Sequence, residues 1–186
     1  ITQHIGATEV PFDTVSKICG PLLKEGTTTL PGLLFIDTPG HHSFTTLRSR
    51  GGALADLAVL VVDITEGFKP QTLESINILK QHQTPFIIAL NKVDKMPNWR
   101  SRTGSFIANH SKQSPIAKQN LQTRLYEIIG ELGSHDFDSA LFSEIEDFQK
   151  TIALIPTSAK ETGEGGPELF MILMGLAQKY LRGRLL

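Results

Sequence analysis

The chain has 186 residues, of which 40% are hydrophobic and 20% charged, a length and composition that fit one compact domain with a sizeable core. Its formal net charge of −1 excludes a protein that binds nucleic acid through overall positive charge. The single cysteine, Cys19, excludes an intramolecular disulfide, and the apolar runs are too short to span a bilayer, so we expect a cytoplasmic protein, or a piece of one, with no membrane partner.

Four short apolar runs predict strands, at residues 33–36, 57–62, 85–90 and 152–156. Each run is continuous rather than alternating, which is typical of strands buried on both faces of a parallel sheet. One helix is predicted to open at Pro70, where apolar residues follow at helical spacing: Leu73, Ile76 and Leu79. A last helix opens at Pro167, and its apolar stripe consists of Leu169, Ile172, Leu173, Leu176, Ala177 and Tyr180. The alternation indicates an open α/β sheet covered on both faces, which binds ligands at the carboxyl ends of its strands.

The segment from 95 to 150 is less regular than the rest of the chain. It begins polar and basic, as "KMPNWRSRTGSF", and continues with two predicted helices, over residues 116–132 and 138–150. Because it is too long for a plain connection between strands, we interpret it as a helical insertion within the domain. The sole tryptophan, Trp99, is expected to pack this insertion onto the core.

Polar signatures follow three of the four apolar runs. "DTPG" (37–40) follows the first run, "NKVD" (91–94) the third and "TSAK" (157–160) the fourth. Since the carboxyl ends of parallel strands meet at one edge of a sheet, these three signatures should converge. Together they are typical of a site for guanine nucleotide bound with magnesium.

The first signature suits the phosphate end of a nucleotide. Asp37 ends its strand where a carboxylate could hold Mg²⁺, directly or through water. Gly40 has no side chain, so its backbone N–H could approach a terminal phosphate closely. The alternative is an ordinary type I or type II turn with Pro39 at its second position.

The second and third signatures suit the base. Guanine presents two adjacent donors, N1–H and the 2-amino group, which the Asp94 carboxylate can accept together, whereas adenine does not offer this pair. Asn91 would tether the neighbouring loops, and the aliphatic stem of Lys92 would cover the base. The backbone N–H of Ala159 would then donate to guanine O6. A chance NKxD at a strand end is the alternative.

His41, directly after the first signature, is the candidate catalytic residue. Its ordinary pKa of about 6.5 allows a neutral or a protonated imidazole to position an attacking water and to stabilise developing charge. His42 is interpreted as a surface residue. A zinc site formed by His4, His41 and His42 is disfavoured, because no cysteine or carboxylate stands at ligand spacing.

With these motifs in place, the chain resembles the G domain of archaeal and eukaryotic translation initiation factor 5B, and more distantly bacterial initiation factor 2. "ITQHIGATEVP" is similar to the switch I region of that family, and "LPGLLFIDTPGHHSF" to its switch II region. "TPFIIALNKVDKMPNW" carries the guanine signature in the setting of the family, and "TGEGGPELFMILMGLAQKYL" resembles its closing helix. The resemblance covers essentially the whole chain.

This resemblance implies the three-layer α/β fold of a P-loop translational GTPase, with switch I over 1–12, switch II over 37–56 and the insertion over 95–150. It implies that Thr2 and Asp37 hold Mg²⁺, that Gly40 senses the γ-phosphate and that His41 is catalytic. The guanine pocket would consist of Asn91, Lys92, Asp94, Ser158, Ala159 and Lys160. GTP would be hydrolysed to GDP on the ribosome, near the RNA of the large subunit, by a monomeric factor that promotes subunit joining. Initiator tRNA would be recognised by other domains.

One departure from the family bears on activity. No GxxxxGK[ST] phosphate loop occurs in the sequence, whereas the family carries one upstream of switch I. We therefore expect residues 1–186 to be a partial G domain without the first strand and the phosphate loop, which by itself neither binds GTP tightly nor hydrolyses it. The alternative is a catalytically incompetent G-domain fragment that serves only as a ribosome- or partner-binding module.

Overall fold

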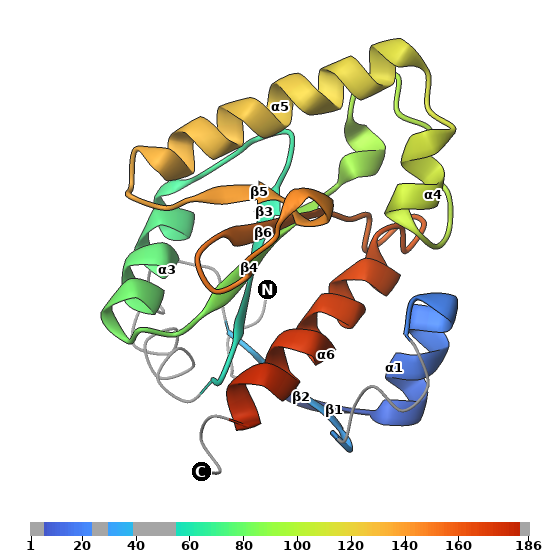
Figure 1. Ribbon diagram of the computed structural model, residues 1–186. Coiled ribbons are helices and arrows are strands. Elements are labelled where there is room, and N and C mark those ends of the chain that lie inside the picture. Colours follow the sequence, from blue (N-terminus) through green and yellow to red (C-terminus); the bar gives the residue numbers. More distant parts are fainter. Residues whose placement is uncertain (1–5, 24–29, 39–54, 183–186) are drawn as a thin grey trace. The chain divides into compact units, whose positions relative to one another are not determined.

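The computed structural model describes residues 6–23, 30–38 and 55–182, and the chain divides into two compact units. The first unit comprises residues 1–58, 69–86 and 170–186, and the second comprises residues 59–68 and 87–169. Figure 1 shows the elements of both units in sequence colours.

A two-stranded antiparallel sheet opens the first unit. Strand β1 (Gly6–Pro11) pairs with β2 (Gly32–Asp37), in a register that places Gly6 opposite Asp37. The strand expected at 33–36 is therefore confirmed, whereas β1 was not predicted. Its sequence, "GATEVP", lacks an apolar run, and its residues are mostly exposed. It therefore forms a strand because it pairs with β2, and not because of its local sequence.

Helices α1 and α6 form the core of the first unit. Helix α1 (Phe12–Cys19) buries Val15 and Cys19, which lie four residues apart on one helical face, and Met174 of α6 (Gly166–Arg182) joins them. The Phe35 ring of β2 contacts Phe170 edge-on, with centroids 5.7 Å apart. The last helix predicted from Pro167 is thus confirmed. Helix α3 (Pro70–Gln81) confirms the helix predicted from Pro70, with Ile76 and Leu79 buried.

The second unit is built on a four-stranded sheet with the order β3-β4-β6-β5. Its strands are β3 (Ala58–Asp63), β4 (Phe86–Asn91), β6 (Ile152–Pro156) and β5 (Ser139–Leu141). Strand β6 pairs in parallel with both of its neighbours, β4 and β5. The three apolar runs predicted as β3, β4 and β6 are confirmed to within one residue. Their continuous apolar character fits the burial of residues 87–90 and 153–155.

The segment from 95 to 150 contains helix α4 (Phe106–Ser111) and helix α5 (Pro115–Gly133). The hydroxyls of Ser105 and Ser114 cap the two helices by accepting the backbone N–H of Ala108 and of Ala117. The helix predicted over 116–132 is confirmed, and one face of α5 is buried through Ala117, Leu121, Leu125, Ile128 and Leu132. In Figure 1, α5 runs alongside the sheet of the second unit.

The helix predicted over 138–150 was wrong. This stretch forms strand β5 and then a short 3₁₀ helix, η4 (Phe142–Glu144), followed by turns. Parallel pairing with β6 overrides the helical preference of residues 139–141. Further on, the Asp147 carboxylate accepts the backbone N–H of Gln149, a local bond that competes with helix formation.

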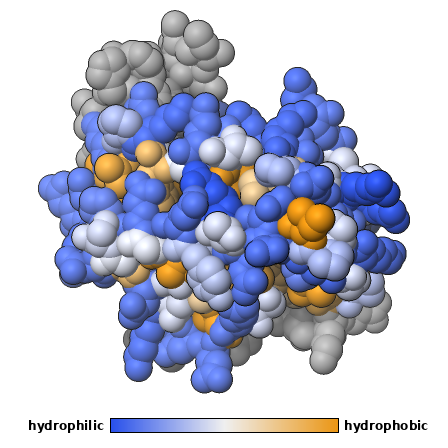
Figure 2. Space-filling model, turned by 90° about the horizontal axis from the view of Figure 1, so that it is seen from above, coloured by the Kyte–Doolittle hydropathy of each residue, from blue (hydrophilic) through white to orange (hydrophobic). Residues whose placement is uncertain are grey.

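The face of the molecule seen in Figure 2 is mostly hydrophilic, and its hydrophobic residues are scattered. Ile116 and Tyr126 of α5 are largely exposed. Scattered apolar residues are normal on a protein surface and mark no binding patch. Within the described residues, no helix has the length and apolar character needed to cross a membrane.

Gly165, directly before α6, lies very close to the backbone at the end of β6. It has a φ of +75°, and a Cβ at this position would lie 2.1 Å from the carbonyl oxygen of Pro156. Gly163 has a φ of +70° but no neighbour within 4 Å of its would-be Cβ. We predict that Gly165→Ala lowers the free energy of unfolding by about 3 kcal/mol or more, through backbone strain and a clash that only a backbone shift relieves.

Gly163→Ala is the matched control, since it carries the strain without the clash, and it should cost about 1 kcal/mol. Urea denaturation of both variants measures the difference. Equal losses in the two variants would show that the close approach to Pro156 is relieved at no cost.

Candidate functional site

Two loops that follow neighbouring strands meet at the carboxyl edge of the second unit's sheet. Because β4 and β6 pair in parallel, with Leu90 opposite Pro156, the loops after them start side by side. Backbone hydrogen bonds join these loops: the N–H of Thr157 donates to the carbonyl of Leu90 (2.8 Å), and the N–H of Val93 donates to the carbonyl of Thr157 (3.0 Å). The structure thus brings together the second and third signatures, NKVD and TSAK.

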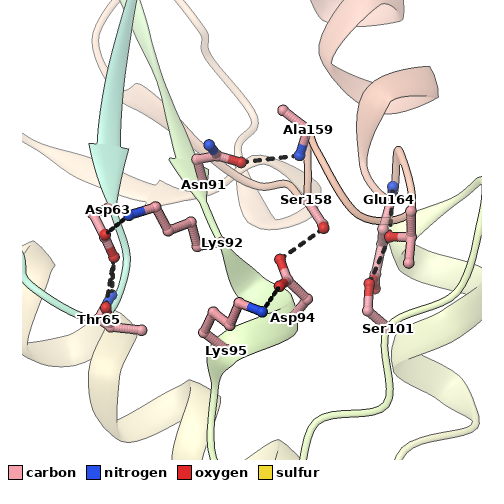
Figure 3. A network of polar contacts seen from close by, with 11 residues as sticks. Asp63, Thr65, Asn91, Lys92, Asp94, Lys95, Ser101, Ser158, Ala159 and Glu164 are labelled. Carbon is pink, nitrogen blue, oxygen red and sulfur yellow. Dashed lines mark hydrogen bonds and ion pairs between the residues drawn. The ribbon is translucent and has the colours of Figure 1, made fainter.

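Side chains join the same two loops, as Figure 3 shows. The amide oxygen of Asn91 accepts the backbone N–H of Ala159 at 3.0 Å. The Asp94 carboxylate accepts the hydroxyl of Ser158 at 2.7 Å through Oδ1, and its Oδ2 lies 3.3 Å from the ammonium of Lys95. Asn91 therefore makes the kind of tether between loops that the sequence indicated. The N–H of Ala159 that was expected to reach guanine O6 donates to Asn91 in this structure.

Lys92 is held in an unusual position. Its backbone adopts the left-handed conformation, with a φ of 67°, which is uncommon for a residue with a side chain. Its ammonium donates to Asp63 Oδ2 at 2.5 Å, across from the end of β3 (Figure 3). The other oxygen of Asp63 accepts the backbone N–H and the hydroxyl of Thr65, at 2.9 and 2.6 Å. Thr65 therefore holds Oδ1 of Asp63, and Oδ2 is directed at Lys92.

Sequence reasoning missed Asp63. The available signal was its place directly after the apolar run at 57–62, the same kind of place that drew attention to Asp37. It was overlooked because no known signature follows it.

The two aspartates of this edge have lowered pKa values. Burial raises the pKa of Asp63, but hydrogen bonds from Lys92 and Thr65 and the charge of Lys92 outweigh it and bring the pKa to about 2. For Asp94, burial again raises the pKa, and hydrogen bonds from Ser158 and Lys95 lower it more, so the net pKa lies below its usual value. Both carboxylates are thus ionised at neutral pH and act as acceptors. The hydrogen bond to Asp63 raises the pKa of Lys92, which stays charged.

Ser158, which donates to Asp94, is buried, and Lys160 is exposed, both in the loop after β6. Asp37 ends β2 in the first unit as an exposed carboxylate, an oxygen ligand of the kind that Mg²⁺ prefers. Thr2, Gly40 and His41 lie outside the described residues. Among the residues that the structure describes, no cluster of three His, Cys, Asp or Glu side chains has the geometry for a metal ion.

A cavity of about 570 Å³ lies beside the 95–150 segment of the second unit, lined by Asn98, Trp99, Arg100, Lys112, Gln113 and Ser114. None of the predicted nucleotide-binding residues contributes to it. The candidate nucleotide site is therefore formed by the joined loops after β4 and β6, and not by this cavity.

The Asp63–Lys92 pair predicts a particular response to acid. The folded-state pKa of Asp63 lies below the ordinary 3.8, so its stabilisation is complete above about pH 4 and is lost as the pH falls toward 2. Because the Lys92 side chain is 54% exposed, solvent screening keeps this contribution small. We predict that Asp63→Asn removes this part of the acid dependence of the unfolding free energy, measured by urea denaturation between pH 5 and 2.

The exposed Asp138 provides the control, since Asp138→Asn should keep the acid dependence of the unaltered chain. If Asp63→Asn also keeps it, the ion pair with Lys92 does not stabilise the fold.

The sequence matches the family described as "Elongation factor Tu GTP binding domain" over residues 1–179. It is 55% identical over 186 residues to "Probable translation initiation factor IF-2" of Methanococcoides burtonii and 56% identical over 187 residues to the protein of the same name in Methanosarcina acetivorans. Each match covers 100% of this chain and 31% of the relative. The chain therefore spans about a third of the length of these relatives.

Solved structures agree with the sequence comparison. The structure described as "Crystal structure of GDP-bound aIF5B from Aeropyrum pernix" superposes with a TM-score of 0.86 at 50% identity, over 100% of this chain and 31% of that one. The elongation factor SelB of Methanococcus maripaludis, at 20% identity and a TM-score of 0.60, shares the fold. The expected α/β fold of a translational GTPase G domain is confirmed, and the chain belongs to the elongation factor Tu GTP-binding domain family.

Proposed function

We propose that this chain is the guanine-nucleotide-binding part of an archaeal-type translation initiation factor that hydrolyses GTP to GDP on the ribosome. The observation that carries the proposal is the pair of cross-links between NKVD and TSAK, from Asn91 to Ala159 and from Ser158 to Asp94. Two loops that are remote in the sequence are thereby held as one surface at the edge of a parallel sheet, where ligands bind in such folds.

Asp94 would select the base. Its carboxylate is ionised and only 10% exposed, so it can accept both N1–H and the 2-amino group of guanine in a site with little competing water. Adenine has no donor at N1 and no 2-amino group, and it would leave this charge without partners. Lys92, fixed by Asp63, would lay its stem along the face of the base. The relative whose crystal structure is described as GDP-bound supports this assignment by its 50% identity to the chain.

Asp37 and Thr2 would hold the magnesium ion that accompanies the phosphates. Asp37 supports this assignment as an exposed carboxylate at the end of β2, opposite Gly6 of β1. A bound Mg²⁺ would neutralise phosphate charge during hydrolysis. Gly40 would contact the γ-phosphate through its backbone, and His41 would orient the attacking water.

The ribosome is the proposed partner, with contact near the RNA of the large subunit, and initiator tRNA would bind through domains beyond this chain. The names of the archaeal relatives support a role in initiation. The alternative, a catalytically incompetent module that only docks on the ribosome or a partner, is less favoured, because the similarity to initiation factors extends over 100% of the chain.

Asp94→Asn should change the preference for the base. An asparagine amide offers one acceptor and one donor, which match N1–H and the 2-oxo group of xanthine but not the two donors of guanine. We predict that the variant loses at least about tenfold in affinity for GDP, or about 1.4 kcal/mol, and gains affinity for xanthosine diphosphate. Competition with a fluorescent GDP analogue measures both, in the longer protein that carries this chain, with and without the substitution.

Asp138→Asn, with the same chemical change at an exposed site in the second unit, should leave both affinities unchanged. A variant at Asp94 that still prefers GDP as strongly as the unaltered chain would contradict the assignment of Asp94 to the base.

His41→Ala tests the proposed hydrolysis in the longer protein that carries this chain. Loss of the imidazole should slow ribosome-stimulated GTP hydrolysis by about 10²- to 10⁴-fold, the usual contribution of a positioned acid–base group, while leaving the affinity for GDP unchanged. Phosphate release is the measurement. His42→Ala serves as the neighbouring control and should keep the original rate, whereas equal effects of the two substitutions would argue against a specific role for His41.

A further inference from the structure

Glu164 is a carboxylate buried inside the second unit, with 0% of its surface exposed. Three neutral side chains of the 95–150 segment donate hydrogen bonds to it. Asn109 Nδ2 donates to Oε1 at 2.7 Å, while the indole N–H of Trp99 and the hydroxyl of Ser101 donate to Oε2 at 3.2 and 2.5 Å. Figure 3 shows the contact with Ser101 beside the candidate nucleotide site. A buried carboxylate needs such donors to offset its lost hydration.

The main chain of Glu164 belongs to the loop that carries TSAK. The backbone N–H of Ser158 donates to the carbonyl of Glu164 at 2.9 Å, and the N–H of Gly163 donates back to the carbonyl of Ser158 at 2.7 Å. The loop from 158 to 164 is thus closed at its base by these two bonds. Ser158, held from behind by Glu164, donates its hydroxyl forward to Asp94.

The donors that hold Glu164 are themselves fixed. The Trp99 ring is 7% exposed and stacks on Phe106, with centroids 5.7 Å apart and planes 11° apart. Asn109 also donates to the carbonyl of Arg100 at 3.0 Å, and its amide oxygen accepts Gln113 Nε2 at 3.0 Å. The 99–113 part of the segment therefore presents a pre-formed set of donors. Trp99, which was expected to pack the segment onto the core, stacks on Phe106 within the segment and donates to Glu164 outside it.

We propose that Glu164 is a positioning residue for the guanine pocket, through which the 95–150 segment sets the geometry of Ser158 and Asp94. The proposal rests on the proposed function, because it assigns Asp94 to the base. The chain of contacts runs from Trp99, Ser101 and Asn109 to Glu164, from its carbonyl to Ser158, and from the Ser158 hydroxyl to Asp94. Displacement of the segment would loosen the pocket and weaken guanine nucleotide binding, so the segment regulates the affinity of the site.

The simpler role of structural support has a matched control in Glu168. It is also 0% exposed, and its Oε1 also accepts donors of the 95–150 segment, the Ser105 hydroxyl at 2.6 Å and the Ile107 N–H at 3.2 Å. Its contacts hold the start of α4 and do not include the 158–164 loop. A substitution of either glutamate thus disturbs the packing of the segment, but only one should reach Ser158.

The test compares Glu164→Gln with Glu168→Gln by amide hydrogen exchange. A glutamine has one acceptor oxygen, so it cannot serve Asn109 on one side and Trp99 with Ser101 on the other. We expect the amides of Ser158 and Gly163 to exchange at least about tenfold faster in Glu164→Gln and at an unchanged rate in Glu168→Gln. Unchanged exchange in Glu164→Gln, or equal acceleration in both variants, would overturn the proposal.

Trp99→Phe keeps the aromatic stacking and removes only one donor, so it supplies the answer if Glu164→Gln does not fold. It should accelerate exchange at Ser158 about threefold, and no acceleration would overturn the proposal.

Titration with a fluorescent GDP analogue then separates the role of Glu164 from the proposed function. If the longer protein that carries this chain binds GDP, Glu164→Gln should weaken binding about tenfold and Glu168→Gln less than twofold. If that longer protein does not bind GDP, the proposed function fails, while hydrogen exchange still decides the role of Glu164.

Discussion

Parallel pairing of β4 with β6 is the constraint on which the candidate site depends. The register that sets Leu90 opposite Pro156 brings two loops, more than sixty residues apart in the sequence, to the same edge of the sheet. Backbone bonds at Thr157 and Val93 then lock them before any side chain takes part. A slip of register in a parallel pair buried on both faces is costly, because a shift would exchange the side chains that are closely packed on each face. The packing of the apolar strands therefore fixes where the two loops of the candidate site lie.

Three carboxylates connect the loops of the candidate site to the elements around them. Asp63 connects the end of β3 to Lys92, Asp94 connects the loop after β4 to Ser158, and Glu164 connects the loop after β6 to the 95–150 segment. Each acceptor is satisfied by donors from another element, so none of these elements can move alone without leaving a polar group unpaired. Through these bonds, the segment from 95 to 150, which lies between β4 and β6 in the sequence, is connected to the loop after β6.

The elements that could be predicted from the sequence are those whose burial produces a local pattern of apolar residues. Continuous apolar runs predicted β3, β4 and β6, and helical spacing after a proline predicted α3 and α6, because burial on both faces or on one stripe leaves a direct mark on composition. The loop signatures predicted that Asn91, Asp94, Ser158 and Ala159 would meet. Long-range pairing leaves no pattern in the local sequence. β1 and β5 are strands because they pair with β2 and β6, and the helix predicted over 138–150 was wrong because residues 139–141 pair with β6. Asp63 and Glu164 escaped notice because their partners lie 29 and up to 65 residues away.

The central claim is that this edge of the sheet recognises guanine, and calorimetric titration with GDP and, separately, with ADP tests it most directly. The two nucleotides share the diphosphate and the ribose, so any difference in binding reports on the base. With the longer protein that carries this chain, the account predicts measurable heat for GDP and at least about a hundredfold weaker binding of ADP, since adenine would leave the ionised Asp94 without donors. Equal affinity for the two nucleotides would contradict it.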